Sequence, residues 1–489
     1  MALLNKNIIL TGNFPGNCRQ KPMDKTKPAS PTNGIALTST AKYPETADRG
    51  IMSDGLLRRR TGWNQDPIIS HGIKNQSLQY HGINKFLNKT GHSGKKKRFI
   101  IIFYPQAGFL KTVFLFLITV FLVSCTAGSP GGTGTTNSHD VNIIEIAKRV
   151  TLIRSQGYSQ LRVLDPWQGA DGVVQEWYLV PRGSVPPEGA DSSKIISVPL
   201  KKIVCMSTTH LAMINALGER NSVCGFSGTR YIYDPSLREL VKNGKISEIG
   251  YDDNIDKEKI ISLSPDLVMI YGIGSESAGY LAKLQNLGIR IVFNADYLED
   301  DPLGKAEWIK VIGALYCRDA MADSIFSELR DRYLGLKAGI DAGIKLRKKV
   351  LLGMPFKDTW FISPGNSYIS ALIRDAGGEY LWDDKNSRVS MPMALEAVYS
   401  RAVNADFWLN AGNVNSRAEI TAIDARLGNL PCFLEGNIYN NNNRLSQEGG
   451  NDYWESGCIS PDLILKDIGA ILHPELFREH KLFYYRLVK

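Results

Sequence analysis

From Leu200 onward the sequence alternates short apolar strands with helices, and this alternation constrains the fold more than any other feature. The expected strands and helices, in chain order, lie at 203–206, 211–217, 222–226, 257–263, 267–271, 280–287 and 289–293. The strands are continuous runs rich in Val and Ile, which is typical of a parallel sheet covered by helices on both faces. We therefore expect an α/β fold.

A longer helix interrupts this alternation. Between residues 320 and 340, apolar side chains recur at helical spacing, at Met321, Ile325, Leu329, Tyr333, Leu336 and Ile340. Strands and helices then resume, with strands expected at 349–353, 359–362 and 406–409 and a helix at 369–376. This order predicts two Rossmann-like lobes with parallel sheets, joined by one long helix. An ordinary core helix is the alternative.

An apolar run upstream, from Phe109 to Val123, follows the basic residues 95–98 and ends in Leu122-Val123-Ser124-Cys125. This layout is typical of an export signal. The ending is similar to a bacterial lipobox, in which cleavage leaves Cys125 to carry lipid. A transmembrane helix is the alternative, but the 16 residues from Phe109 to Ser124 fall short of the roughly 20 that span a bilayer.

Cleavage before Cys125 would divide the charge of the chain unevenly. Residues 1–124 hold 18 Lys and Arg against 5 Asp and Glu, whereas the whole chain has 58 against 49. The remaining 365 residues therefore carry a net charge of −4. Because the basic excess lies in the leader, the mature part argues against a nucleic-acid partner.

The expected organisation combines these features. Residues 1–94 form an unstructured or mis-assigned N-terminal extension, 95–124 a lipoprotein signal peptide, 125–140 a flexible tether, 141–197 a strand-rich addition, 198–318 the N-terminal α/β lobe, 319–344 the linking helix and 345–489 the C-terminal α/β lobe. After Cys125, the mature part contains Cys205, Cys224, Cys317, Cys432 and Cys458. Disulfides between Cys205 and Cys224 or between Cys432 and Cys458 are open alternatives, as are buried free thiols.

Several short motifs, in their order and spacing, resemble the class III periplasmic substrate-binding proteins. They are Lys202 to Ser207 with Ala216-Leu217-Gly218, Gly250-Tyr251, Glu258 to Val268, Ala376-Gly377-Gly378, Leu395-Glu396-Ala397-Val398, and Ser460 to Ile468 with Ile471 to Pro474. The resemblance covers about Val198 to Tyr485. The segments before Val198 and around Asn440 to Asn443 depart from the family's common pattern.

The resemblance implies a function and a set of partners. It implies a lipid-anchored binding protein that captures a ferric siderophore or haem and delivers it to an ABC permease and its ATPase. Cobalamin is the alternative ligand, and no catalytic cofactor or resident metal is implied. The chain is expected to be a monomer at the periplasmic face of a bacterial membrane, attached through lipid on Cys125. The choice between iron complexes and corrinoids, and between inner and outer membrane, stays open.

The resemblance also implies two contacts with the permease. In the family, an exposed acidic residue on each lobe docks into basic residues of the permease, and the matching positions here are Glu258 and Glu396. Two separated carboxylates give register and orientation. The alternative is that each Glu only favours the first turn of its helix through the helix dipole.

Ligand contacts are expected in loops at the carboxyl ends of the strands, where α/β sheets bind ligands. These loops contain Ser207, Thr208, Thr209, His210, Arg230, Tyr231, Tyr251, Asp252, Asp296, Tyr297, Trp360, Ser363, Asn366, Ser367 and Trp382. Aromatic walls suit large planar ligands. Tyr251 is a wall contact or, as in haem-carrying members, an iron ligand; His210 caps, packs or ligates.

The rival class is a surface-anchored enzyme. Gly272-Ile273-Gly274 begins a dinucleotide-binding motif, but Ser277 stands where the third glycine is required. Paired carboxylates such as Asp252-Asp253 are without an accompanying nucleophile and base. The sequence therefore favours a binding protein over an enzyme.

Overall fold

The computed structural model describes residues 140–251, 254–273 and 284–489, and these belong to one structural unit. The signal segment, Cys125 and Asp252 lie outside the described residues. Within the described part of the chain, no helix combines the length and the apolar character needed to cross a membrane.

The described chain begins with a five-stranded sheet, ordered β1-β2-β3-β5-β6. The strands are β1 (Val141–Asn142), β2 (Val150–Ser155), β3 (Tyr158–Leu164), β5 (Val174–Pro181) and β6 (Ile195–Val198), with η1 (Ser192–Lys194) before the last. All neighbours are antiparallel except β5 and β6. Leu152, Leu161 and Trp177 stand side by side in register and are buried, so one face of the sheet packs into the core.

The N-terminal lobe is a parallel sheet in the order β12-β10-β7-β8-β9. Its strands are β7 (Ile203–Cys205), β8 (Val223–Phe226), β9 (Ser247–Glu248), β10 (Leu267–Ile270) and β12 (Ile291–Phe293). The helices are α3 (Thr208–Ala216), α4 (Pro235–Lys242), α5 (Lys257–Leu263) and α7 (Pro302–Leu315), with η2 (Arg220–Ser222), η3 (Thr229–Tyr231) and η5 (Asp296–Leu298). A small pair, β4 (Trp167–Gln168) with β11 (Gly272–Ile273), connects the preceding sheet to this lobe.

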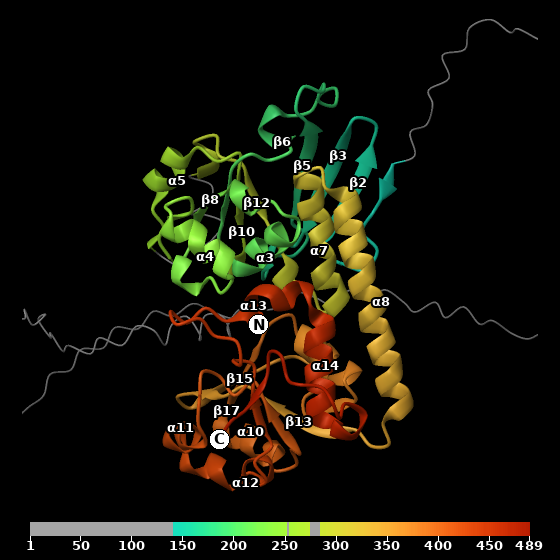
Figure 1. Cartoon of the computed structure of the whole chain (residues 1–489), viewed down its shortest axis with the longest axis vertical. Helices are drawn as coiled ribbons and strands as arrows, with labels where there is room; N and C mark the ends of the chain where they lie inside the picture. The colour runs from blue at the N-terminus through green and yellow to red at the C-terminus, as the bar shows by residue number, and fades with distance from the viewer. Residues whose placement is uncertain (1–139, 252–253, 274–283) are drawn as a thin grey trace, which may run out of the picture. The chain divides into compact units, whose positions relative to one another are not determined.

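The long helix α8 (Asp319–Gly343) follows α7 and packs along it (Figure 1). Its buried side chains include Phe326, Leu329 and Tyr333, which recur at helical spacing. Leu329, Tyr333 and Ile340 of the expected stripe are buried, and Ile325 and Leu336 are half-buried. Met321, however, is exposed, and Phe326 faces the core instead. The predicted α/β class, with parallel sheets and one long helix, is confirmed.

The C-terminal lobe has the sheet order β16-β13-β18-β19-β20, in which only β20 runs antiparallel to its neighbour. Its strands are β13 (Lys348–Leu352), β16 (Gly378–Tyr380), β18 (Phe407–Leu409), β19 (Ile438–Asn440) and β20 (Arg486–Leu487). A separate antiparallel sheet contains β14 (Pro355–Phe356), β15 (Thr359–Ile362) and β17 (Met391–Ala394). The helices are α9 (Tyr368–Asp375), α10 (Leu395–Ala402), α11 (Arg417–Ile423), α12 (Pro431–Leu434) and α14 (Pro461–Leu472), with η6 (Ala425–Asn429) and η8 (Pro474–Leu476).

Residues 441–460, which we name the C-terminal bridge, leave the C-terminal lobe after β19 and return to it at α14. The bridge contains α13 (Asp452–Glu455) and η7 (Ser456–Ile459), and both pack against α3 of the N-terminal lobe. Figure 1 shows α13 next to α3. Residues late in the sequence therefore complete a surface of the first lobe.

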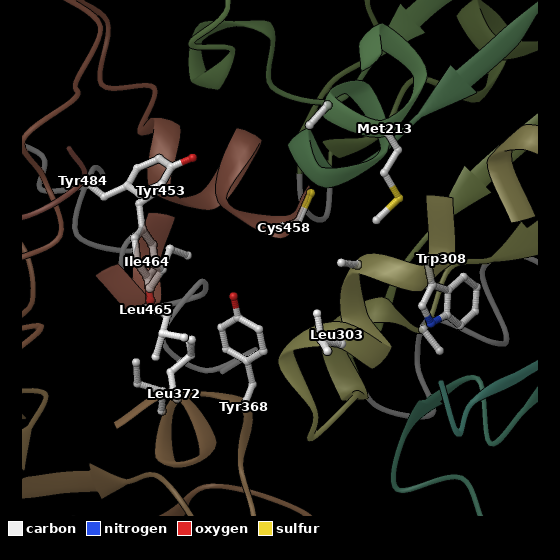
Figure 2. Packing of buried hydrophobic residues seen from close by; sticks show 14 of the residues in the cluster. Met213, Leu303, Trp308, Tyr368, Leu372, Tyr453, Cys458, Ile464, Leu465 and Tyr484 are labelled. Atoms are coloured by element: carbon white, nitrogen blue, oxygen red, sulfur yellow. The ribbon is translucent and has the colours of Figure 1, made fainter. Parts of the chain in front are cut away.

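One apolar core runs through both lobes and the first sheet. Figure 2 shows part of it, with Met213, Leu303 and Trp308 on one side, Leu372 and Leu465 on the other, and Tyr368 and Cys458 between them. All five cysteines of the described chain are free thiols. Neither disulfide considered from the sequence forms in this structure.

Two buried carboxylates fasten the first sheet to the N-terminal lobe. Glu307 on α7 is fully buried and accepts the backbone N–H groups of Glu145, Ile146 and Ala147 at 2.7–2.8 Å. Glu299 accepts those of Lys148 and Arg149 at 2.9 and 2.8 Å. Hydrogen bonds to an ionised acceptor are stronger than neutral ones, so the strand-rich addition is held firmly to α7.

Candidate functional site

A pocket lies where the N-terminal lobe meets the C-terminal bridge and α9. Its lining residues are Met206, Ser207, Thr208, Thr209, Phe226, Ser227, Tyr231, Tyr251, Tyr271, Asp296, Tyr297, Lys305, Tyr368, Gly449, Asn451, Tyr453, Trp454, Gly457 and Cys458. Its volume of about 120 Å³ is below the roughly 300–1,000 Å³ of typical small-molecule sites. A large ligand therefore enters only when the walls separate.

The pocket wall on the side of the N-terminal lobe follows the ends of β7 and β8. Ser207 caps α3, because its hydroxyl accepts the N–H of Thr209 at 3.3 Å. Thr208 donates its hydroxyl to the backbone carbonyl of Trp454 at 3.3 Å, which joins this wall to the bridge. Strand ends thus place small hydroxyl side chains at the pocket, as the sequence predicts.

Aromatic rings form most of the remaining wall. The rings of Tyr231 and Tyr251 pack with centroids 5.2 Å apart, and those of Tyr271 and Tyr297 are 6.1 Å apart. Gly228 makes room for the first pair: its φ is +77°, and a Cβ there would lie 2.6 Å from Cδ2 of Tyr251. Such faces suit a flat or apolar ligand, and phenol hydroxyls add hydrogen-bonding groups at the edges.

One buried ion pair lies in the wall. Lys305 Nζ is 3.0 Å from Asp296 Oδ2, and both side chains are almost fully buried. Lys305 also lies over the ring of Tyr368, 5.7 Å from its centroid. Since each charge faces an opposite one, the pair places a strong dipole at the pocket without a net charge.

His210 lies behind this ion pair and does not line the pocket. It is completely buried on α3, and neither ring nitrogen has a hydrogen-bond partner within the described structure. Burial lowers the pKa of His210 to about 4, which keeps the imidazole neutral at physiological pH. Among the described residues, no group of three or more His, Cys, Asp or Glu is placed to hold a metal ion.

A second cavity adjoins the first and shares Tyr297 and Tyr368 with it. Its other lining residues are Arg149, Gln168, Leu298, Glu299, Asp300, Pro364, Asn366, Ser367, Ser387, Arg388, Val389 and Ser390. Arg388 of the C-terminal lobe forms an ion pair with Asp171 of the strand-rich addition at 2.9 Å. The addition therefore borders the site region as well as α7.

The structure brings seven of the expected ligand contacts together in the first pocket. They are Ser207, Thr208, Thr209, Tyr231, Tyr251, Asp296 and Tyr297. Asn366 and Ser367 line the second cavity instead. The seven share the pocket with residues of the bridge, whereas the second cavity has no bridge residue among its lining.

Five other expected contacts lie elsewhere, for physical reasons. Trp360 is fully buried, donates to the carbonyl of Leu352 at 3.0 Å and packs on Trp408. Trp382 is buried beneath Arg401, and Ser363 is buried as well. Arg230 points to an exposed cavity that includes Arg238 and Glu448. His210 is the fifth, as described above.

Sequence reasoning missed the contacts supplied by Lys305, Tyr368 and the bridge. Lys305 lies inside α7 and Tyr368 begins α9, so neither stands in a loop directly after a strand. The bridge residues Tyr453, Trp454 and Cys458 lie between the segment around Asn440 to Asn443 and the motif that begins at Ser460, and belong to none of the quoted motifs. The Tyr453-Trp454 pair, in a stretch without clear periodicity, was the only available signal.

The two acidic residues predicted to dock on a permease lie on separate lobes. Glu258 is exposed in the first turn of α5, and Glu396 is exposed in the first turn of α10. Arg426 forms ion pairs with Glu396 at 3.0 Å and with Asp424 at 2.7 Å. Glu396 therefore belongs to a charge cluster. Its carboxyl accepts a local backbone hydrogen bond and a hydrogen bond from Arg426, and these lower its pKa.

Two α/β lobes around a shared pocket define the class of two-lobed solute-binding proteins. Residues 203–429 match the family model described as periplasmic binding protein. The match covers a little under half of the chain, and over these residues the sequence is similar to the periplasmic binding protein family. Since that family consists of solute-binding proteins, the prediction of a binding protein in place of an enzyme is confirmed.

The chain is also similar to individual proteins. An uncharacterised lipoprotein of Methanocaldococcus jannaschii is 26% identical over 365 residues, or 70% of this chain and 84% of that protein. A second lipoprotein of that organism is 28% identical over 65% of this chain and 82% of its own length. A cobalamin-binding protein of Halobacterium salinarum is 26% identical over 43% of this chain and 54% of that protein. Among solved structures, a periplasmic haem-binding protein of Pseudomonas aeruginosa has a TM-score of 0.46 at 16% identity, covering 59% of this chain and 98% of that chain.

Proposed function

We propose that this chain is the lipid-anchored substrate-binding protein of an ABC importer, and that it captures an iron complex, either a ferric siderophore or haem. The observation that carries the proposal is the tyrosine-rich pocket between the N-terminal lobe and the bridge. Aromatic faces pack on the flat or apolar surface of a metal chelate, and hydroxyl groups bond its polar rim.

Cobalamin is the second candidate ligand, and a specific observation favours it. Two curated relatives from Halobacterium salinarum are named cobalamin-binding proteins, and each matches 215 residues of this chain. A corrinoid is also large and carries polar groups around its rim. The same pocket chemistry therefore supports it.

Export and anchoring are part of the proposal. The sequence similar to a lipobox ends at Cys125, and two relatives are named lipoproteins. A lipid on Cys125 would keep the binding protein within diffusion range of its permease. Mass spectrometry of the membrane-extracted protein tests this directly: a diacylated N-terminal Cys125 is expected, and a chain beginning elsewhere without lipid contradicts it.

Native purification followed by absorbance spectroscopy and mass spectrometry tests the ligand class. A Soret band identifies haem, a corrin spectrum identifies cobalamin, and a visible charge-transfer band identifies a ferric siderophore. The purified protein is then stripped and titrated with haemin, ferrichrome and cyanocobalamin. If no metal chelate co-purifies and none of the three probes binds, the proposal that the ligand is a metal chelate is refuted.

Docking on the permease is tested with Glu258→Ala combined with Glu396→Ala. The expected result is a loss of uptake with unchanged ligand affinity, because both carboxylates are exposed and lie outside the pocket. The matched control replaces Glu239 and Glu379, one exposed glutamate on each lobe, with Ala. Normal uptake by the first double variant would overturn the docking assignment.

A further inference from the structure

The C-terminal bridge is held to the N-terminal lobe by one buried carboxylate. Glu455 is 2% exposed and accepts the backbone N–H groups of Tyr233 and Asp234 at 2.7 and 2.9 Å. These two amides stand immediately before α4, which Asp234 caps. Glu455 is therefore the acceptor that connects the end of α13 to the start of α4.

Besides the apolar packing of α13 and η7 on α3 and the position of Arg444 over the ring of Tyr233, the other polar contacts between bridge and lobe are longer or exposed. Thr208 donates to the carbonyl of Trp454 at 3.3 Å, and Cys458 Sγ lies 3.7 Å from the carbonyl of Thr209. An ion pair joins Arg238 and Glu448, but both side chains are more than a third exposed. Exposed pairs contribute little, whereas buried donors and acceptors must keep their partners, because leaving them unsatisfied is costly.

The segment that Glu455 holds is also a wall of the pocket. Tyr453 and Trp454, the two residues before it, line the pocket with Cys458 after it. Figure 2 shows Tyr453 and Cys458 of the bridge with Tyr368 below them. Since the pocket of about 120 Å³ is small for a metal chelate, ligand entry requires a wall of the pocket to move, and the bridge is the wall that Glu455 holds.

We propose that Glu455 is a positioning residue that fixes the bridge wall of the ligand pocket against the N-terminal lobe, and that protonation of its carboxylate strengthens this closure. Only the expected effect of Glu455 on ligand affinity rests on the proposed function. The docking of the bridge itself requires no ligand.

The charges around Glu455 set the sign of the effect. Asp452 on α13 and Asp234 before α4 both face it, and Arg444 is paired with Asp452 at 2.5 Å. On η7 the neighbouring group is the thiol of Cys458. Burial, reinforced by the two aspartates, raises the pKa of Glu455 from 4.5 to about 7 despite the two backbone hydrogen bonds.

A docked bridge therefore binds the proton of Glu455 more tightly than a released bridge, in which the carboxyl is solvated. Raising the pH through 7 removes that proton and disfavours docking. If the released carboxyl titrates at its ordinary value of 4.5, the docking equilibrium falls about tenfold between pH 6 and pH 8.

Hydrogen exchange measured by mass spectrometry tests docking without any ligand. After correction for the intrinsic exchange rate, protection of the amides of Tyr233 and Asp234 should fall about tenfold from pH 6 to pH 8. Glu455→Gln, which keeps the side-chain volume, should flatten this slope. Glu448→Gln, at the exposed ion pair of the same bridge, should leave the slope unchanged.

Wild-type protection that is flat or rises with pH, or a wild-type slope in Glu455→Gln, would overturn the proposal. A thermal melt of each variant checks folding, and Glu455→Asp, which shortens the reach to the two amides, provides a second variant. The ligand arm uses the probe that binds, haemin or cyanocobalamin. Its Kd should rise over the same range by at most about tenfold, and by less the more completely the bridge is docked in the free protein. If amide protection depends on pH as expected but neither probe binds, the role of Glu455 in docking the bridge is retained and the proposed ligand class is refuted.

Discussion

Replacing Glu307 with Gln tests how the strand-rich addition is fastened. Glu307 is fully buried, accepts three backbone N–H groups from residues 145–147, and lies 3.0 Å from Lys310 Nζ. A glutamine retains one carbonyl oxygen but presents its amide hydrogens to at least one of these donors. It also leaves Lys310, which is itself buried, with the backbone carbonyl of Ile143 and, as counter-charges, the exposed carboxylate of Glu145 and the more distant Asp323.

The expected cost follows from these contacts. Breaking a buried ion pair by removing one partner costs about 3–5 kcal/mol, and an unsatisfied buried donor costs about 1–3 kcal/mol. Because the two effects share the same atoms and are not additive, we expect the free energy of unfolding to fall by about 3–5 kcal/mol. This is a large part of the roughly 5–15 kcal/mol that stabilises a folded protein.

Urea unfolding followed by tryptophan fluorescence measures the change, because Trp308 is buried next to Glu307 on α7. The matched control is Glu145→Gln, which removes an exposed carboxylate from the same group and should cost less than about 1 kcal/mol. A loss below about 1 kcal/mol in Glu307→Gln would refute the reasoning, since the carboxylate would then contribute no more than an exposed pair.

Two further predictions concern the pocket and the thiols. Gly228→Ala should weaken ligand binding at least about tenfold, because the new Cβ would push Tyr251 from the pocket wall. Gly244 also has a positive φ but lies in open space, so Gly244→Ala should leave the affinity unchanged in the same titration. Maleimide labelling of the native protein should modify Cys317 first, since it alone of the described cysteines is exposed. Peptide mapping that finds another of the five described cysteines labelled before Cys317 would contradict the second prediction. Equal affinity of both glycine variants would contradict the first.

The alternation of strands and helices was enough to predict the fold class because each parallel strand is buried on both faces and must be apolar throughout. The long helix was predictable for a related reason: Phe326, Leu329 and Tyr333 face one core and therefore share a helical stripe. These signals are local in the sequence. They required no knowledge of which segments lie side by side.

The pocket was predictable only where it depends on strand ends. Ser207 and Asp296 lie directly after strands, and parallel strands bring their carboxyl ends to one edge. Trp360 also stands in a strand, yet its indole turns into the lobe, where it finds both an acceptor and an aromatic neighbour. Tyr453 and Trp454 reach the pocket through a long-range crossing that no local pattern records.

The C-terminal bridge has a consequence for the order in which the protein becomes competent. Synthesis presents the N-terminal lobe first, and domains generally fold as units in that order. Residues 441–460, however, supply a wall of the pocket that faces α3. A growing chain would thus hold an open half-site until almost its last residues are made.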